Sequence, residues 1–216
     1  GGVDSRVLLD LLRLYPGVKV VVAHFDHGIG PDSTQDRLFV EDLARRFGLP
    51  FVYDEGKLGP DASEDEARTA RYDFLQKVRL ASGATAIVTA HHQDDVLETV
   101  LINLLRGTGR KGLSSLKSTD TVVRPLLHAP KKEIVDYARR HGLHWREDST
   151  NAQTEYLRNH IRHNLLPRFD EAKRQQLLDV TARMHEINQE LDGLLEAGLQ
   201  PTLNREWFIL LPYDVE

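Results

Sequence analysis

A run of small and polar residues, Gly1-Gly2-Val3-Asp4-Ser5, stands directly before a predicted helix. Glycines let a backbone approach a ligand closely, and a helix N-terminus directs unpaired N–H groups and a positive dipole end toward an anion. The Ser5 hydroxyl adds a donor. The run lacks the lysine and the longer spacing of a Walker A loop. It therefore predicts an anion site of another kind, or else a glycine turn in which Asp4 or Ser5 is a plain helix N-cap.

A second group of ionisable residues lies between Ala90 and Thr99 and holds two histidines and three acids. Asp95 and Glu98 are three residues apart in a predicted helix, so their side chains share a face. Two carboxylates beside a phosphate site would repel it unless a cation such as Mg²⁺ or a substrate ammonium group lies between. The alternative is that acids in a first helical turn complement its dipole. Adjacent His91 and His92 lack the spacing of a zinc-chelating pair.

A third polar segment, HFDHG over residues 24–28, follows a predicted strand that begins at Val18. It could cradle an adenosine at the edge of a sheet. Taken alone, the segment is better interpreted as a polar loop.

Strand and helix patterns alternate over the first two thirds of the chain. They predict helix Asp4–Tyr15, strand Val18–Phe25, helix Ser33–Phe47, strand Phe51–Tyr53, helix Glu64–Leu80, strand Ala86–Ala90, helix His92–Leu105, strand Thr121–Val123 and helix Pro130–His141. This alternation implies an α/β fold, a doubly wound parallel sheet with helices on both faces. Ligands of such sheets bind at the carboxyl ends of the strands, where all three polar groups lie.

From about Asp148 onward the pattern contains helices alone. Apolar residues spaced three and four apart predict a stripe on one long helix, typical of core packing or of a helix–helix contact: Leu177, Val180, Met184, Ile187, Leu191 and Leu194. We therefore expect an α/β domain over residues 1–148 and a helical segment with a linker over residues 149–216. We also expect the chain to be a fragment of a longer protein.

Composition excludes several classes of chemistry. The 216 residues include no cysteine, which removes disulfides, cysteine-bound zinc, iron–sulfur clusters and thiol nucleophiles. No apolar run approaches the ~20 residues that span a bilayer, and we expect a cytoplasmic protein without a secretory signal. A net charge of -5 argues against wrapping nucleic acid with the whole surface. Local basic clusters remain, and they are either solvated faces or contacts to a polyanion.

Six motifs in this order resemble a known family. They are GGVDS, HFDHG, EARTARYDFL, TAHHQDDVLETVLINLLRGTG, RPLL and EDSTNAQTEYLRNHIRHNLLP. The first matches the end of the SGGxDS motif of the PP-loop ATP pyrophosphatases, and the longer blocks resemble the tRNA(Ile)-lysidine synthases among them. The resemblance covers roughly Gly1 to Pro167. It implies that residues 1–148 are a catalytic domain with the Rossmann-like fold of the adenine nucleotide alpha hydrolases, followed by tRNA-binding domains beyond this chain. It also implies a first strand ahead of Gly1. A parallel sheet without that strand exposes unpaired backbone groups, so we expect the chain to be poorly stable without it.

The resemblance also implies a reaction. Members of this family use ATP and L-lysine to convert the wobble cytidine of tRNA(Ile) with a CAU anticodon into lysidine. The cytidine C2 oxygen attacks the α-phosphate of ATP, pyrophosphate leaves, and the lysine amine then displaces AMP. The implied partners are ATP with Mg²⁺, L-lysine and the tRNA, with a homodimer as a candidate assembly and no membrane.

Site residues carry over at the matching positions. Catalytic roles fall to Asp4, Arg71, Asp95 and Glu98. The ATP-binding residues are Gly1, Gly2, Val3, Asp4, Ser5, Ala23, Phe25 and His91. Lysine binding falls to Arg71, Asp95 and Glu98, metal binding to Asp4 and Asp95, and tRNA binding to Arg106, Arg158 and Arg162. Arg71 has an alternative as a surface ion pair with Glu64 or Glu66.

One position departs from the family, because Ile29-Gly30-Pro31 stands where a basic residue usually follows HxxHG. Three other functions remain open at this point. A tRNA-thiolating enzyme generally needs a cysteine, which this chain lacks. An ammonia-dependent ligase would not need the basic segment Arg158–Arg168. A nucleotide-binding module without catalysis would not need Asp4, Asp95 and Glu98.

Overall fold

The computed structural model describes residues 1–26, 33–56, 64–114, 116–146 and 157–198. Expectations for the end of HFDHG, for Ile29–Pro31, for DSTN and for the domain boundary at residue 148 lie outside these residues. The elements in chain order are α1 (Val3–Leu14), β1 (Val22–Asp26), α2 (Ser33–Arg46), β2 (Phe51–Glu55), α3 (Glu64–Ser82), β3 (Ile87–Val88), α4 (Gln93–Leu105), η1 (Arg110–Ser114), β4 (Val122–Val123), α5 (Lys131–Arg140), α6 (Leu157–His160), η3 (Ile161–Leu165), η4 (Leu166–Arg168) and α7 (Glu171–Gly198).

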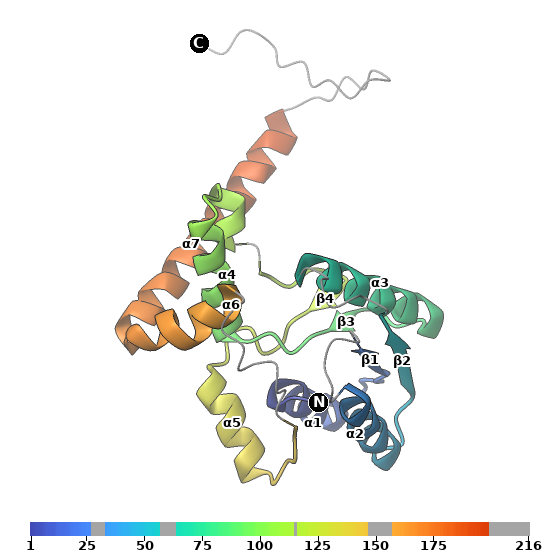
Figure 1. Ribbon diagram of the computed structural model, residues 1–216. Coiled ribbons are helices and arrows are strands. Elements are labelled where there is room, and N and C mark those ends of the chain that lie inside the picture. The colour runs from blue at the N-terminus through green and yellow to red at the C-terminus, as the bar shows by residue number, and fades with distance from the viewer. Residues whose placement is uncertain (27–32, 57–63, 115, 147–156, 199–216) are drawn as a thin grey trace, which may run out of the picture.

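All strand pairing in the described chain is parallel. β1 pairs with β2 in the register Val22 to Phe51, and β3 pairs with β4 in the register Ile87 to Val122. Helix α3 covers one side of the strands and α1 and α2 cover the other (Figure 1). The predicted α/β architecture with helices on both faces is therefore confirmed.

The strands form two separate pairs within the described residues, where one continuous sheet was expected. A cavity of about 280 Å³ lies between them, and its walls are mainly aliphatic side chains of β1, β3 and the flanking helices. The predicted strand Val18–Phe25 begins only at Val22, because Val18–Val21 line this cavity without a strand partner in the described chain.

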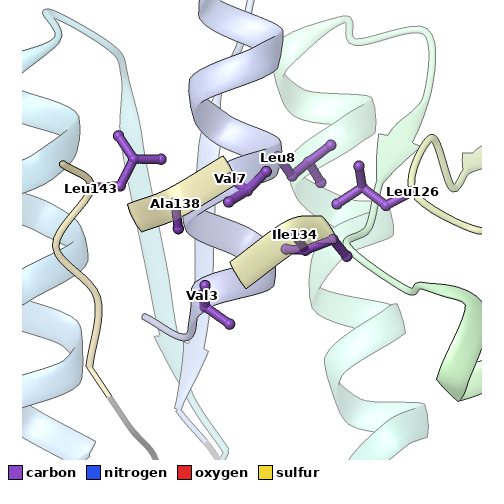
Figure 2. Close-up of a cluster of buried hydrophobic side chains, with 7 residues drawn as sticks. All are labelled: Val3, Val7, Leu8, Leu126, Ile134, Ala138 and Leu143. Atoms are coloured by element: carbon purple, nitrogen blue, oxygen red, sulfur yellow. The ribbon is translucent and has the colours of Figure 1, made fainter. Parts of the chain in front are cut away.

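Two hydrophobic clusters hold the helices that carry the polar motifs. The first joins α1 to α5 and to the segments beside α5 (Figure 2). Its members are Val3, Val7, Leu8, Leu126, Ile134, Ala138 and Leu143. The second joins α4 to η3 and η4 and includes the fully buried Leu97 and Ile161. The helices α1, α4 and α5, which carry the polar motifs, are therefore held in place by these two hydrophobic clusters.

A buried polar contact fixes α5 on α1 in addition to the apolar packing. The Tyr137 hydroxyl of α5 donates to Asp10 of α1 at 3.0 Å, and Arg13 donates to the same carboxylate at 2.9 Å. Burial alone would raise the pKa of Asp10, but the bonds from Arg13 and Tyr137 outweigh it and the pKa is lowered. The charged Asp10 carboxylate therefore fixes the position of α5 against α1 through Tyr137.

Helix α7 extends away from the strands (Figure 1). Leu177 of its predicted stripe packs on the second cluster, whereas Val180, Ile187, Leu191 and Leu194 are exposed. The stripe is core packing only at its beginning. None of the described helices is both long enough and apolar enough to cross a membrane.

Candidate functional site

Three helices begin at one place, and each contributes a side chain there. Asp4 is the second residue of α1, His92 is the N-cap of α4, and Lys131 is the first residue of α5. The Lys131 ammonium donates to both Asp4 oxygens, at 2.6 and 2.8 Å. The His92 Nε2 atom lies 3.7 Å from the same carboxylate. Since each helix N-terminus carries partial positive charge, this convergence favours an anion.

The N-terminus of α1 has no side-chain cap among the described residues. Its N-cap is Gly2, and the Ser5 hydroxyl donates to the Gly2 carbonyl at 2.9 Å rather than capping N–H groups. The interpretation of Asp4 or Ser5 as a plain N-cap is therefore wrong. The first N–H groups of a helix lack intrahelical partners, so α1 offers donors to a ligand.

A carboxylate pair on α4 lies next to this point. Asp95 accepts the His92 backbone N–H at 2.8 Å, and its carboxylate lies 3.6 Å from the His92 Nε2 atom. The His92 ring thus stands within 4 Å of both Asp4 and Asp95. Asp95 also caps its own helix, as the alternative that acids of the first turn complement the helix dipole predicts.

Glu98 forms a two-point ion pair with Arg162. The guanidinium donates from Nε to Oε1 at 2.6 Å and from Nη2 to Oε2 at 2.8 Å, and Nη2 lies 3.6 Å from Asp95. The shared face expected for Asp95 and Glu98 is confirmed, because one guanidinium reaches both. Arg162 was expected to contact tRNA. In this structure its charge faces the two acids.

Burial governs the charge of this pair. Desolvation raises the pKa of Glu98, and the bonds from Arg162 only partly oppose it. The bonds to Glu98 more than offset the desolvation of Arg162 and raise its pKa. Arg162 lies in η3, a π-helical turn, a geometry that frequently occurs at functional sites.

Arg71 and His91 lie together beside the end of β3. Burial lowers the pKa of His91 to about 4, and among the neighbouring charges Asp95 raises it while Arg124, Arg71 and Arg68 lower it. Burial likewise lowers the pKa of Arg71. The guanidinium carbon of Arg71 lies 5.5 Å from the Tyr72 ring centroid.

The β1 residues that were expected to bind adenosine have different neighbours from the acidic pair. Ala23 lines the apolar cavity together with Gly1 and Ser5. Phe25 packs its ring 5.6 Å from that of Phe74 on α3. The structure therefore brings Gly1, Ser5 and Ala23 to one wall, but the acids Asp95 and Glu98 do not line that cavity.

The two other residues expected to contact tRNA lie at different distances from the acidic pair. Arg106 is the exposed C-cap of α4. Arg158 is on α6 and its charge lowers the pKa of Glu98, so it lies close to that carboxylate.

Lys131 and His92 are site residues that sequence reasoning missed. Lys131 belongs to one of the local basic clusters of the sequence, which indicated no partner for it, and His92 was considered only as a zinc ligand. One sequence signal did exist for Lys131. A cation in the first turn of a helix opposes the dipole, so its position directly after Pro130 calls for a nearby anion.

The oxygen donors fit a magnesium ion only in combination with a ligand. Within the described parts of the chain, no three His, Asp or Glu side chains gather closely enough to hold a metal ion by themselves. Asp4 and Asp95 provide two carboxylates on either side of His92. Magnesium is usually held by one or two carboxylates together with substrate phosphates, so the pair fits that chemistry.

Comparison with known proteins identifies the class. The family model described as a PP-loop domain matches residues 1–169, and the chain belongs to this family. Its fold is also that of a solved U34-tRNA thiolase, NcsA from Methanococcus maripaludis with its [4Fe-4S] cluster. The TM-score is 0.67 and the identity 19%, over 86% of this chain and 70% of that one.

More similar relatives carry one name. The chain is 40% identical to the tRNA(Ile)-lysidine synthase of Solibacter usitatus over 87% of its length. It is 42% identical to that of Thermus thermophilus over 94%, and 35% identical to that of Thermotoga maritima over 100%. It spans 43%, 41% and 54% of those proteins, so it corresponds to about half of each.

Proposed function

We propose that this chain is the catalytic part of an enzyme that forms lysidine in tRNA(Ile) from ATP and L-lysine. One observation carries the proposal, which is that the uncapped start of α1 and the Asp95 carboxylate of α4 adjoin across a single histidine. His92 Nε2 lies 3.7 Å from Asp4, at the uncapped start of α1, and 3.6 Å from Asp95. A reaction that joins a phosphate-activated group to an amine needs these two sites side by side.

The start of α1 binds the phosphates in this proposal. Backbone N–H groups of the Gly1–Ser5 loop donate to the departing pyrophosphate and offset the charge that develops on it. Ala23, Phe25 and His91 border the nucleoside, whose apolar face suits the wall formed by β1. Arg71 supplies positive charge beside the α-phosphate or the lysine carboxylate, where its planar fork fits an oxyanion.

Asp95 receives the lysine amine. Glu98 is less suited to that role, because Arg162 already holds both of its oxygens. We assign Glu98 and Arg162 to positioning, with the Arg162 guanidinium also near enough to Asp95 to orient it. For attack on C2 of the activated cytidine, the amine must lose a proton, and Asp95 is the carboxylate within reach of the amine it binds.

Asp4 would hold Mg²⁺ together with phosphate oxygens, and Asp95 would be a second ligand of the ion only while it does not hold the amine. The ion neutralises charge on the phosphates when it is bound. The tRNA would lie over Arg106 and Arg158, with its CAU anticodon loop at the acidic pair. A homodimer and a cytoplasmic location remain predictions of the sequence.

A single pair of variants in the full-length protein tests the assignment. We expect Asp95→Asn to retain ATP binding and to lower lysine incorporation into a tRNA(Ile) transcript with a CAU anticodon by about 100-fold or more. Asp94→Asn is the matched control. It is the neighbouring acid of the same helix turn and faces Arg174 at 3.7 Å, so its activity is expected to stay near that of the parent protein.

Radiolabelled lysine in tRNA and released pyrophosphate are measured in the same reactions. Normal lysine transfer by Asp95→Asn would remove Asp95 from the mechanism. Release of ADP and orthophosphate by the parent protein would contradict the proposed cleavage at the α-phosphate.

A further inference from the structure

Lys131 is placed where a helix does not favour it. It is the first residue of α5, and a positive side chain at that position opposes the dipole of its own helix. The starts of α1 and α4 lie at the same point and add partial positive charge. The ammonium is retained there by the Asp4 carboxylate, which accepts from it through both oxygens at 2.6 and 2.8 Å.

The contact between Lys131 and Asp4 is accessible to exchange. The side chains are 38% and 26% exposed, respectively. A partly solvated ion pair contributes little net stability, so a ligand with stronger charge can displace one partner. The helix behind the lysine does not need to move, because Ile134 and Ala138 are buried against α1 and Tyr137 is bonded to Asp10.

The buried His92 lies beside this ion pair. Its side chain is 7% exposed, and its Nε2 atom lies between Asp4 and Asp95, 3.7 and 3.6 Å away. The His92 and Asp95 side chains form the capping box that begins α4. His92 is therefore fixed by its own helix, whereas the Lys131 side chain is partly exposed and can turn to a ligand.

We infer that Lys131 is a phosphate-binding residue whose ammonium is held by Asp4 until a nucleoside triphosphate binds. The phosphate oxygens then accept from Lys131 in place of Asp4, which leaves the Asp4 carboxylate available to a cation. The inference rests on the proposed function and adds a residue that would bind the β- or γ-phosphate side of the nucleotide. A triphosphate carries more negative charge than a single carboxylate, and this larger Coulomb attraction favours the exchange.

The test compares Lys131→Ala, Lys131→Arg and Lys132→Ala in the full-length protein. Lys132 is the adjacent, exposed lysine on the same helix turn and forms no ion pair with a described residue. Binding of ATP, inorganic pyrophosphate and adenosine is measured by displacement of a fluorescent ATP analogue. Thermal unfolding of each variant confirms that it is folded.

We expect Lys131→Ala to weaken the binding of ATP and of pyrophosphate by about tenfold or more, and to change adenosine binding by less than about twofold. Lys131→Arg should restore most of the phosphate affinity, and Lys132→Ala should match the parent protein.

Equal ATP and pyrophosphate affinities in Lys131→Ala and the parent would overturn the inference. So would equal losses for ATP and adenosine, or a raised KM for lysine with unchanged phosphate binding, which would assign Lys131 to the amine site. Failure of the parent protein to bind ATP or pyrophosphate would contradict the proposed function itself. This outcome is measured on the unsubstituted protein and is therefore distinct from any result of the Lys131 variants.

Discussion

At the scale of single residues, the site balances its acids with internal cations. Lys131 faces Asp4, and Arg162 faces Glu98. Only Asp95 is left without a close two-point cation partner in the described chain, since its nearest guanidinium nitrogen is 3.6 Å away. This difference distinguishes Asp95 as the acid most open to a substrate ammonium group.

His91 provides a pH-dependent prediction at this scale. Its pKa is lowered from 6.5 to about 4, mainly by burial, so the folded state binds its proton less readily than the unfolded chain. Between pH 6.5 and 4 the unfolded chain therefore takes up more protons, and stability falls as the pH falls. We expect His91→Gln to lose less stability than the parent protein between pH 7 and pH 5.

Urea unfolding midpoints at the two pH values measure the difference. His128→Gln, which changes an exposed histidine, is the control and should follow the parent protein. An unchanged pH dependence in His91→Gln would contradict the assignment.

At the scale of elements, η3 connects the site to the second hydrophobic cluster. Ile161 and the neighbouring Leu166 are buried against α4, and the turn between them directs Arg162 to Glu98. A π-helical turn adds a residue to the helix, which allows apolar residues to keep their packing while a polar residue turns toward the site. Arg162, which pairs with Glu98, is therefore carried by an element of the hydrophobic core.

A double-mutant cycle on the ion pair between Arg162 and Glu98 tests whether η3 stabilises α4 through this contact. We expect Arg162→Ala to destabilise the protein by about 2–3 kcal/mol, because it leaves the buried Glu98 carboxylate without its charged partner. Adding Glu98→Gln should recover part of that loss, giving a coupling of about 1–3 kcal/mol. Arg45→Ala, which breaks an exposed ion pair with Asp42, should cost less than about 1 kcal/mol. Additive effects of the two substitutions would contradict the coupling.

Local patterns predicted the helices well and long-range pairs not at all. The helix expected over Asp4–Tyr15 is Val3–Leu14, and the spacing of Asp95 and Glu98 correctly predicted a shared face. By contrast, the pairing of Lys131 with Asp4 joins residues 127 positions apart, and depends on how α5 packs on α1. Periodicity describes one element at a time, so it could not indicate which cation would meet which acid.

At the scale of the whole molecule, the cavity between the two strand pairs is the feature that bears on stability. Its walls come from β1, β3, α1, α2 and α3, and the strands on either side have no hydrogen-bonded partner across it in the described chain. Aliphatic walls and unpaired strand edges favour a further apolar strand at this place. The resemblance to the PP-loop family implies such a strand ahead of Gly1.

Extension of the chain to include the residues that precede Gly1 in the full-length protein tests this prediction. We expect the extended protein to be more stable by roughly 3–6 kcal/mol, the value of burying two or three large aliphatic side chains. An extension of equal length made of Gly and Ser is the control. Equal urea midpoints for the native and the Gly/Ser extensions would contradict the prediction.

The position of Arg162 late in the chain has a consequence for synthesis on the ribosome. Glu98 emerges 64 residues before the guanidinium that neutralises it. While those 64 residues are being synthesised, Glu98 cannot pair with Arg162, although it is buried in the folded protein. Final closure around α4 must therefore wait until the segment Ile161–Leu166 has left the exit tunnel.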